Sequence, residues 1–383
     1  MTVTVDPPPV PRAKAPGLGT RIARLIARPG FQSWAARNIL TRRIARREGA
    51  ELFDLVQGFV KSQVLYALVE LRVLHRLMSG PQTTGALAQG TGITLDRMLR
   101  LLQAGAALGL LKRRRGGNFA IARKGAALLG VPGLEQMIRH HDVLYRDMAD
   151  PVALLRGEVE TELAEFWPYV FGAQGAIDPD VTSTYSDLMA QSQGLVAQDT
   201  LRAVSLSGVR HLLDIGGGFG AFATAAARAE PGMKVTLFDL PHVVDAARPR
   251  LVEAGLSDRI ITAAGSFRDD PLPLGADAVS LIRVLYDHED DTVSALLSKT
   301  FDALPDGGRL IVSEPMSGGA APEPAGDVYF AFYTLAMRTG TVRSASRIAE
   351  MCKAAGFDQI ASPRPARPYV TSTPTARKTV QSA

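Results

Sequence analysis

The sequence predicts an α/β protein in which a helical amino-terminal half precedes a mostly parallel, doubly wound sheet. After residue 208, short apolar runs alternate with segments of helical periodicity, and the first run leads into a glycine-rich turn, Gly216 to Gly220. In the helical half, two helical segments precede two short strands joined by Gly116 and Gly117. We therefore expect a Rossmann-like domain preceded by a winged-helix domain.

The length and composition indicate a multidomain protein of a reducing compartment. The 383 residues, 46% of them hydrophobic, can bury a sizeable core. We do not expect the proline-rich start to act as a secretory leader, because it lacks an apolar block. The one cysteine, Cys352, cannot form an internal disulfide, and no uncharged apolar run approaches the ~20 residues of a membrane-spanning helix. We expect a cytoplasmic protein with four segments: a basic, partly mobile leader (1–49), a winged-helix dimerisation domain (50–130), a helical linker with substrate-pocket residues (131–205) and a cofactor-binding domain (206–383).

The positive charge is concentrated at one end of the chain. The net charge of +5 and the pI near 9.4 suggest a nucleic-acid-binding protein. Residues 1–50, however, carry ten basic groups against two acidic ones, whereas the other 333 residues carry 33 against 36. The body of the protein therefore has no net positive charge with which to bind a polyanion.

The basic end has the pattern of a cationic amphipathic segment. Between residues 21 and 47, basic residues alternate with apolar ones such as Phe31 and Trp34. Such a segment fits either peripheral contact with a membrane or a solvated helix face. Residues 50–78 are apolar around most of a helical circumference, so we expect a helix buried from two sides, with the second subunit of a homodimer on one of them.

Segments 83–92, 94–111 and 111–125 predict a helix, a second helix and a β-hairpin, which is the order of a winged helix. A basic wing can bind DNA, but winged helices also serve as dimer scaffolds, and neither helix has a comparable basic face. We expect no nucleic-acid partner and keep a winged-helix DNA-binding regulator as the alternative. The basic residues of the wing are Lys112, Arg113, Arg114 and Arg115.

Residues 130–200 look helical and rich in aromatic side chains and methionine. Core packing explains any single one of them, whereas as a set between two domains they could line a large apolar pocket. The set is Met137, His140, His141, Tyr145, Met148, Phe166, Trp167, Tyr169, Phe171, Tyr185 and Met189.

Strands alternating with helices after residue 208 indicate a parallel sheet with helices on both faces. The predicted strands are 209–215, 234–240, 259–267, 277–285 and 309–316, and the predicted helices are 219–229, 242–254, 291–304 and 344–355.

The glycine-rich turn is the candidate cofactor site, because glycines allow a sharp turn and let a ligand approach the main chain. Asp239 follows Gly220 by 19 residues at the end of the second strand, where a carboxylate can accept both ribose hydroxyls. Gly218-x-Gly220-x-x-Ala223 also fits a dinucleotide fingerprint, so a nicotinamide enzyme is an alternative. Asp214 just before the glycines, and the late position of this domain in the chain, favour S-adenosylmethionine.

Several motifs, in order, resemble the O-methyltransferases of the plant caffeate and hydroxyindole type. Among them are LLDIGGGFG (212–220), LFDLPHVV (237–244), RVLYDHEDD (283–291) and ALPDGGRLIVSEPM (303–316). Within that family, segments such as MIRHHDVLYRDMADPVALLRGE and ELAEFWPYVFGA are similar to the bacterial carotenoid hydroxyl O-methyltransferases.

This resemblance implies a class I methyltransferase domain behind a winged-helix dimerisation domain, with S-adenosylmethionine as cofactor. It further implies methylation of the tertiary hydroxyl of an acyclic hydroxycarotenoid, in the biosynthesis of spheroidene- or spirilloxanthin-type photosynthetic carotenoids. The alternative acceptor is another hydrophobic scaffold, such as a polyketide, a phenol or a chlorophyll-type ring. A dimer, with peripheral membrane contact through the basic leader, fits such an apolar acceptor.

By position, the resemblance assigns the methionine part of the cofactor to the glycine turn, the ribose to Asp239 and the adenine to Ser266 and Phe267. Members of the family usually have an aspartate at the position of Ser266, where serine offers a hydrogen bond but no charge. The predicted cofactor-binding residues are Asp214, Gly216, Gly218, Gly220, Asp239, Leu240, Ser266, Phe267 and Arg283.

The catalytic histidine of the family is replaced here by Tyr286, which Asp287 and His288 follow. The glutamate that orients this histidine matches Glu314, and the second such glutamate falls near Arg343. The pKa of a tertiary alcohol is far above that of any side chain, so a base can take its proton only as the new bond forms. We predict His288 as that base, with Tyr286 holding the acceptor hydroxyl and Asp287 orienting the base. We expect no metal, because no histidine pairs with the cysteine at ligand spacing.

Overall fold

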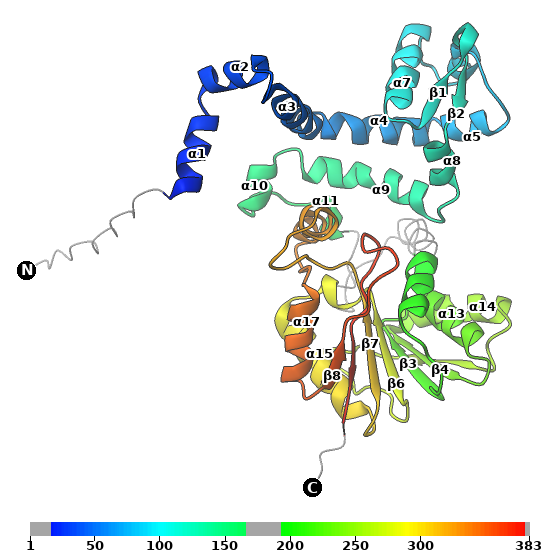
Figure 1. Ribbon diagram of the computed structural model, residues 1–383. Coiled ribbons are helices and arrows are strands. Elements are labelled where there is room, and N and C mark those ends of the chain that lie inside the picture. Colours follow the sequence, from blue (N-terminus) through cyan, green and yellow to red (C-terminus); the bar gives the residue numbers. More distant parts are fainter. Residues whose placement is uncertain (1–16, 166–192, 380–383) are drawn as a thin grey trace, which may run out of the picture.

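The computed structural model describes residues 17–165 and 193–379 (Figure 1). The proline-rich start of the leader lies outside the described residues. The same holds for six members of the aromatic and methionine set, Phe166, Trp167, Tyr169, Phe171, Tyr185 and Met189.

Seven strands form one sheet in the order β5-β4-β3-β6-β7-β9-β8. The five predicted strands are confirmed and parallel, and β9 runs antiparallel to both β7 and β8. The strand order reverses between β3 and β6, and doubly wound sheets bind their ligands at the carboxyl ends of the strands beside such a reversal. The strands are β3 (His211–Ile215), β4 (Lys234–Asp239), β5 (Ile260–Ala264), β6 (Ala278–Ile282), β7 (Arg309–Ser313), β8 (Asp358–Ala361) and β9 (Thr375–Arg377).

Alternation along the strands divides the core of this domain into two layers. Leu212 on one face of β3 packs in a cluster with residues of α13 (Ala221–Ala229) and α14 (Pro241–Glu253). The next residue, Leu213, joins a second cluster with α15 (Asp290–Ala303) and α17 (Ala345–Ala354). Both faces of the sheet are therefore buried, as the continuous apolar runs predict, and the four predicted helices are confirmed.

The amino-terminal helices differ from the single helix expected at 50–78. The chain bends by 54° between α3 and α4, and Arg72, with φ of 52°, separates α4 from α5. Burial from two sides is seen only in the later part, because Leu68 is fully buried whereas Phe53 is 62% exposed. The helices are α1 (Leu18–Ile26), α2 (Pro29–Arg37), α3 (Arg42–Val56), α4 (Gly58–Glu70) and α5 (Val73–Met78).

The two-helix and hairpin order expected at 83–125 is present. Strands β1 and β2 pair antiparallel, and the buried Phe119 joins Leu102 of α7 in the core of this part. Gly125 lies so close to Leu110 that a Cβ there would be 2.3 Å from the Leu110 carbonyl oxygen, so only glycine fits. The elements are α6 (Thr84–Ala88), α7 (Leu95–Ala107), β1 (Leu111–Arg113), the 3-10 turn η1 (Arg115–Gly117), β2 (Phe119–Ile121) and α8 (Arg123–Leu129).

The helix α9 (Leu134–Asp147) joins the two halves, because it contacts α4 on one side and α16 (Ala331–Met337) on the other. It is followed by α10 (Pro151–Leu155) and α11 (Glu162–Glu165), and α16 is preceded by the π-helical turn η4 (Pro324–Phe330). In the described parts of the chain no single helix meets the length and hydropathy of a membrane span, although α3 and α4 do so together as a bent pair.

Candidate active site

The glycine turn after β3 packs against the ends of the neighbouring strands. Gly216 and Gly218 have φ of 65° and 55°, in the left-handed region that glycine tolerates. A Cβ on Gly216 would lie 2.7 Å from Val284 Cγ2, whereas one on Gly218 would have no neighbour within 4 Å. The turn is therefore packed closely against Val284 at Gly216 and has open space at Gly218, where a ligand can approach the main chain.

Asp239 ties this turn to the end of β4. Its Oδ2 accepts a hydrogen bond from the Gly218 backbone N at 2.8 Å, and its Oδ1 accepts one from the Leu240 N at 2.7 Å. Burial raises the pKa of this carboxyl, and the two backbone N–H groups oppose the rise. Because a carboxylate has about four lone-pair sites, ribose hydroxyls can still bind here.

Asp214 lies beneath the turn, fully buried in β3. Ser280 Oγ donates to its Oδ1 at 2.6 Å, while Oδ2 has no partner among the described residues. Burial raises the pKa of this carboxyl to about 7. A cationic group bound over the turn would stabilise the carboxylate form, which fits the sulfonium and ammonium of S-adenosylmethionine and not a pyrophosphate.

The turn after β5 carries the predicted adenine contacts. Ser266 Oγ donates to Asp269 Oδ2 at 2.9 Å, and the Ser266 backbone N donates to Asp270 Oδ2 at 2.7 Å. Two carboxylates of this turn therefore lie beside the serine that replaces the family's aspartate. The Phe267 ring meets the His288 ring edge-on, with centroids 5.2 Å apart.

The turn after β6 is held by Glu314, which follows β7. Buried Glu314 accepts hydrogen bonds on Oε1 from the backbone N–H groups of Val284, at 3.1 Å, and of Leu285. Burial raises the pKa of this carboxyl to about 8. We expected Glu314 to orient a base, and the structure shows it binding the main chain of the turn that carries Tyr286 and Asp287.

Tyr286 and Asp287 are buried side by side at the carboxyl end of the sheet. Arg283 Nη2 donates to the Tyr286 hydroxyl at 3.0 Å, and burial raises the pKa of that hydroxyl. Burial also raises the pKa of Asp287 to about 7, against the opposing effects of the Arg283 charge and of the neighbouring Tyr286 hydroxyl. Since Asp287 Oδ1 has no partner within the described residues, this carboxylate has a site for a proton.

His288 lies further along the same turn, on the side of Phe267. Arg268 Nη2 donates to its Nδ1 at 2.9 Å, and burial together with the charges of Arg268 and Arg343 lowers its pKa to about 3. The neutral ring therefore carries its proton on Nε2 and uses its free lone pair to accept from Arg268. In this arrangement the ring is a hydrogen-bond donor beside the turn after β5.

Arg343 stands where the family's second glutamate was expected and has the opposite charge. The side chain is 5% exposed and donates to Asp290 Oδ1 at 2.7 Å, to the Leu285 carbonyl at 2.9 Å and to the His288 carbonyl at 2.8 Å. It joins the turn after β6, through two main-chain carbonyls, to α15, through the Asp290 carboxylate.

Two tyrosines of η4 and α16, which the sequence analysis did not identify, reach this region and meet the two histidines of α9 that it placed in the candidate pocket set. Tyr333 OH and His140 Nε2 are 3.0 Å apart, and Tyr329 OH and His141 Nε2 are 2.8 Å apart. Phe330 lies between this group and Tyr286, with ring centroids 6.5 Å apart. The aromatic run at 329–333 was the available signal, but it has no glycine or strand end to mark it.

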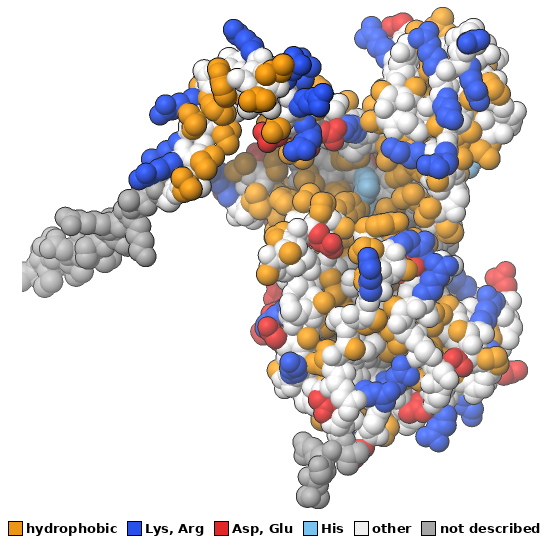
Figure 2. Space-filling model, in the orientation of Figure 1, with side chains coloured by type: hydrophobic (Ala, Val, Ile, Leu, Met, Phe, Trp, Pro, Cys, Tyr) orange, Lys and Arg blue, Asp and Glu red, His pale blue; other side chains and the backbone are white. Residues whose placement is uncertain are grey.

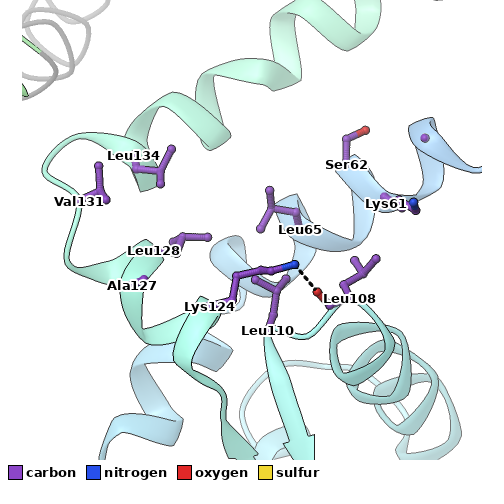
Figure 3. Close-up of a pocket in the computed structure, with 11 residues that line it drawn as sticks. Lys61, Ser62, Leu65, Leu108, Leu110, Lys124, Ala127, Leu128, Val131 and Leu134 are labelled. Atoms are coloured by element: carbon purple, nitrogen blue, oxygen red, sulfur yellow. Dashed lines mark hydrogen bonds between the residues drawn. The ribbon is translucent and has the colours of Figure 1, made fainter. Parts of the chain in front are cut away.

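A hollow of about 570 Å³ lies elsewhere, between α4, α8 and the start of α9. Figure 3 shows Leu65, Leu110 and Leu128 around it and the hydrogen bond from Lys124 Nζ to the Leu108 carbonyl, 3.0 Å long. All of its lining residues belong to the helical half, so it is separate from the glycine turn and the strand ends of the sheet.

The doubly wound sheet, the glycine turn and Asp239 define a nucleoside-binding methyltransferase of class I. The chain belongs to the O-methyltransferase family: residues 145–358 match the O-methyltransferase domain and residues 53–129 match the O-methyltransferase dimerisation domain. It is an S-adenosylmethionine-dependent O-methyltransferase that acts on a small molecule and dimerises through its amino-terminal domain.

Among its relatives, demethylspheroidene O-methyltransferase of Cereibacter sphaeroides is 61% identical over 94% of this chain and 95% of that protein. The Rhodobacter capsulatus protein of the same name is 53% identical over 87% and 83%. Human N-acetylserotonin methyltransferase in complex with SAM is a similar structure, with a TM-score of 0.71 and 26% identity over 87% of this chain and 98% of that one.

Proposed function

We propose that this enzyme transfers the methyl group of S-adenosylmethionine to the tertiary hydroxyl of an acyclic hydroxycarotenoid, as a step in the biosynthesis of spheroidene-type photosynthetic pigments. The observation that carries the proposal is the 61% identity to a demethylspheroidene O-methyltransferase over nearly the full length of both chains. The motifs of the helical linker, quoted above, support the same acceptor class.

The cofactor supplies an electrophilic methyl group on a sulfonium. The glycine turn and Asp239 would hold its methionine and ribose parts, and Ser266, Phe267 and His288 would hold its adenine. Because methyl transfer is an in-line displacement, the main task of these residues is to fix the line of attack and exclude water.

The proton of the acceptor hydroxyl must leave as the new C–O bond forms. Tyr286 is placed to receive it, because its oxygen accepts from Arg283, which leaves the hydroxyl proton of Tyr286 to be given to the neighbouring Asp287 carboxylate. In this relay the acceptor proton moves to the Tyr286 oxygen as the Tyr286 proton moves to Asp287. Asp287, with a pKa of about 7, is the final acceptor. His288 is the second candidate base and would need Arg268 to release Nδ1.

The reaction is tested by incubating the purified enzyme with methyl-labelled S-adenosylmethionine and a panel of detergent-solubilised acceptors: a tertiary hydroxycarotenoid, the same carotenoid already methylated, a phenol and a hydroxyindole. We expect label in the hydroxycarotenoid alone. Label confined to the phenol or the indole would contradict the proposed acceptor.

We further propose that α1 and α2 contact a membrane on the cytoplasmic side, where such an acceptor is dissolved. Leu18, Ile22 and Leu25 lie at helical spacing on one face of α1 and are 76%, 48% and 45% exposed. Arginines occupy the adjoining face of α1, and Trp34 of α2 is 52% exposed. Apolar side chains flanked by arginine are the pattern of helices that lie in the interface of an anionic bilayer.

Serine substitutions test this contact without disturbing a core. Ile22→Ser, Leu25→Ser and Ile26→Ser together should lower binding to vesicles. Three aliphatic residues of the methyltransferase domain, each more exposed than these, serve as the control. Equal vesicle binding by the two triple variants would contradict the contact. The control substitutions are Val252→Ser, Ile261→Ser and Leu274→Ser.

A further inference from the structure

The dimerisation domain is strongly basic in a region that methyl transfer does not use. Between Glu70 and Glu135 the chain carries ten basic residues and one acidic residue, Asp96. Over residues 17–130 the basic residues exceed the acidic ones by 14, whereas over residues 131–383 the acidic residues exceed the basic ones by 10. The molecule therefore has a positive end and a negative end, which its net charge of +5 conceals.

The centre of this charge is the basic hairpin, residues 111–121. Leu111 and Phe119 turn inward and are buried in the core of the domain, so the hairpin is firmly anchored. Gly116 and Gly117, with φ of 82° and 85°, form its tip. Four consecutive basic residues project from the outer side and are all exposed, namely Lys112, Arg113, Arg114 and Arg115.

The helix α7 adds to the same surface. Arg97 and Arg100 are exposed one turn apart, and Arg100 Nη2 lies 4.0 Å from Asp96 Oδ2 in an exposed ion pair. Within the described chain, no ion pair joins an acidic side chain to the four basic residues of the hairpin. Their charge is therefore available to an external anion.

The hairpin lies at the same end of the molecule as the amphipathic helices α1 to α3, with the methyltransferase domain at the opposite end (Figure 1). Figure 2 shows Lys and Arg side chains over both parts, with exposed apolar side chains on the helices. One flat anionic surface can thus meet both, while the negatively charged catalytic domain is directed away from it.

We propose that the basic hairpin, with Arg97 and Arg100 of α7, is a second contact with an anionic phospholipid membrane, electrostatic in nature and separate from the apolar contact of α1 and α2. This inference rests on the membrane contact proposed above and adds a surface to it. Two contacts at separate points fix the orientation of the enzyme on the bilayer, which one amphipathic segment does not. The exposed apolar face of α1, at the same end of the molecule, favours lipid over duplex DNA, which offers no apolar surface to α1.

The test uses the full-length enzyme and vesicles of phosphatidylcholine with either none or 30% phosphatidylglycerol. The hairpin variant carries Lys112→Gln, Arg113→Gln, Arg114→Gln and Arg115→Gln. The control variant removes four exposed basic residues of the methyltransferase domain: Arg228→Gln, Lys234→Gln, Lys353→Gln and Arg364→Gln. Both variants lose four positive charges, so a difference between their vesicle binding shows that the position of the charges matters.

We expect the partition coefficient of the hairpin variant on anionic vesicles to fall at least ~10-fold, since each basic residue near such a surface contributes about 1 kcal/mol. The control variant should change less than ~2-fold, and neither should change on neutral vesicles. Raising the salt from ~0.1 to ~1 M, which shortens the Debye length from ~10 to ~3 Å, should abolish the difference.

Equal losses in the two variants would overturn the proposal, as would a hairpin variant that keeps its vesicle binding but loses affinity for duplex DNA. An unfolding temperature of each variant equal to that of the wild type excludes misfolding as the cause of any loss of vesicle binding. Methylation of the detergent-solubilised hydroxycarotenoid is measured beside the vesicle binding. If the wild type methylates the hydroxycarotenoid but vesicle binding does not depend on the hairpin, only this inference fails. If the wild type does not methylate the hydroxycarotenoid, the proposed function fails.

Discussion

The replacement of Asp287 by Asn is the sharpest test of the proton path, because it predicts a loss of activity together with a gain of stability. Burial raises the pKa of Asp287 from 3.8 to about 7, a difference of roughly 4 kcal/mol between its protonated and ionised forms. The raised pKa means that the folded state binds this proton more tightly than the unfolded chain. The contribution of Asp287 to the free energy of unfolding of the wild type is therefore greatest below pH ~4 and is lost as the pH rises through ~7.

Asn cannot ionise, so the free energy of unfolding of the variant does not fall with this ionisation as the pH rises. Between pH 5 and 8 its free energy of unfolding should rise relative to the wild type by roughly 2.5 kcal/mol, measured by urea denaturation at each pH. Its kcat should fall by ~10²- to 10⁴-fold, and the decline of kcat below pH ~7 that ionisation of Asp287 gives the wild type should disappear.

Single-turnover assays with labelled cofactor and saturating hydroxycarotenoid in detergent measure the chemical step. Asp214→Asn is the matched control, because Asp214 is also buried with a pKa of about 7 but lies beneath the glycine turn. It should alter the affinity for the cofactor and leave the pH profile of kcat unchanged. An Asp287→Asn enzyme within ~3-fold of wild-type kcat, with the wild-type pH profile, would refute the relay.

The other predictions concern the cofactor site. Asp239→Ala should raise the Kd for S-adenosylmethionine by calorimetry, with a smaller effect on kcat at saturating cofactor, and an unchanged Kd would contradict the ribose assignment. His288→Ala should also weaken cofactor binding more than it lowers kcat, because the Nδ1 lone pair of His288 is occupied by Arg268 and cannot take a proton. A loss of kcat at unchanged Kd would restore His288 as the base. Gly216→Ala should destabilise the protein by ~1–3 kcal/mol in denaturant, because its Cβ would meet Val284 at 2.7 Å and its φ is positive, and equal stability would show that the turn can relax.

Much of the fold could be predicted because the responsible patterns are local. Apolar runs bounded by polar turns indicated the five parallel strands, and each was found within two or three residues of its predicted ends. Strands β8 and β9 were not predicted, since four- and three-residue segments such as Asp358–Ala361 carry too little pattern and pair only with distant parts of the chain. The long helix expected at 50–78 divides into three, because hydrophobic composition does not report the bend before Gly58 or the left-handed Arg72.

The class of the protein, its glycine turn and the carboxylate that follows it can be identified from the amino-acid sequence, since these depend on residue type at fixed spacing along one chain. The tertiary structure alone decided the state of each ionisable group in the site. It placed Arg268 against His288, sealed Asp287 from water and directed Glu314 to the main chain of the turn after β6. A proton affinity depends on burial and on charges brought together from distant segments, and spacing along the chain does not contain that information.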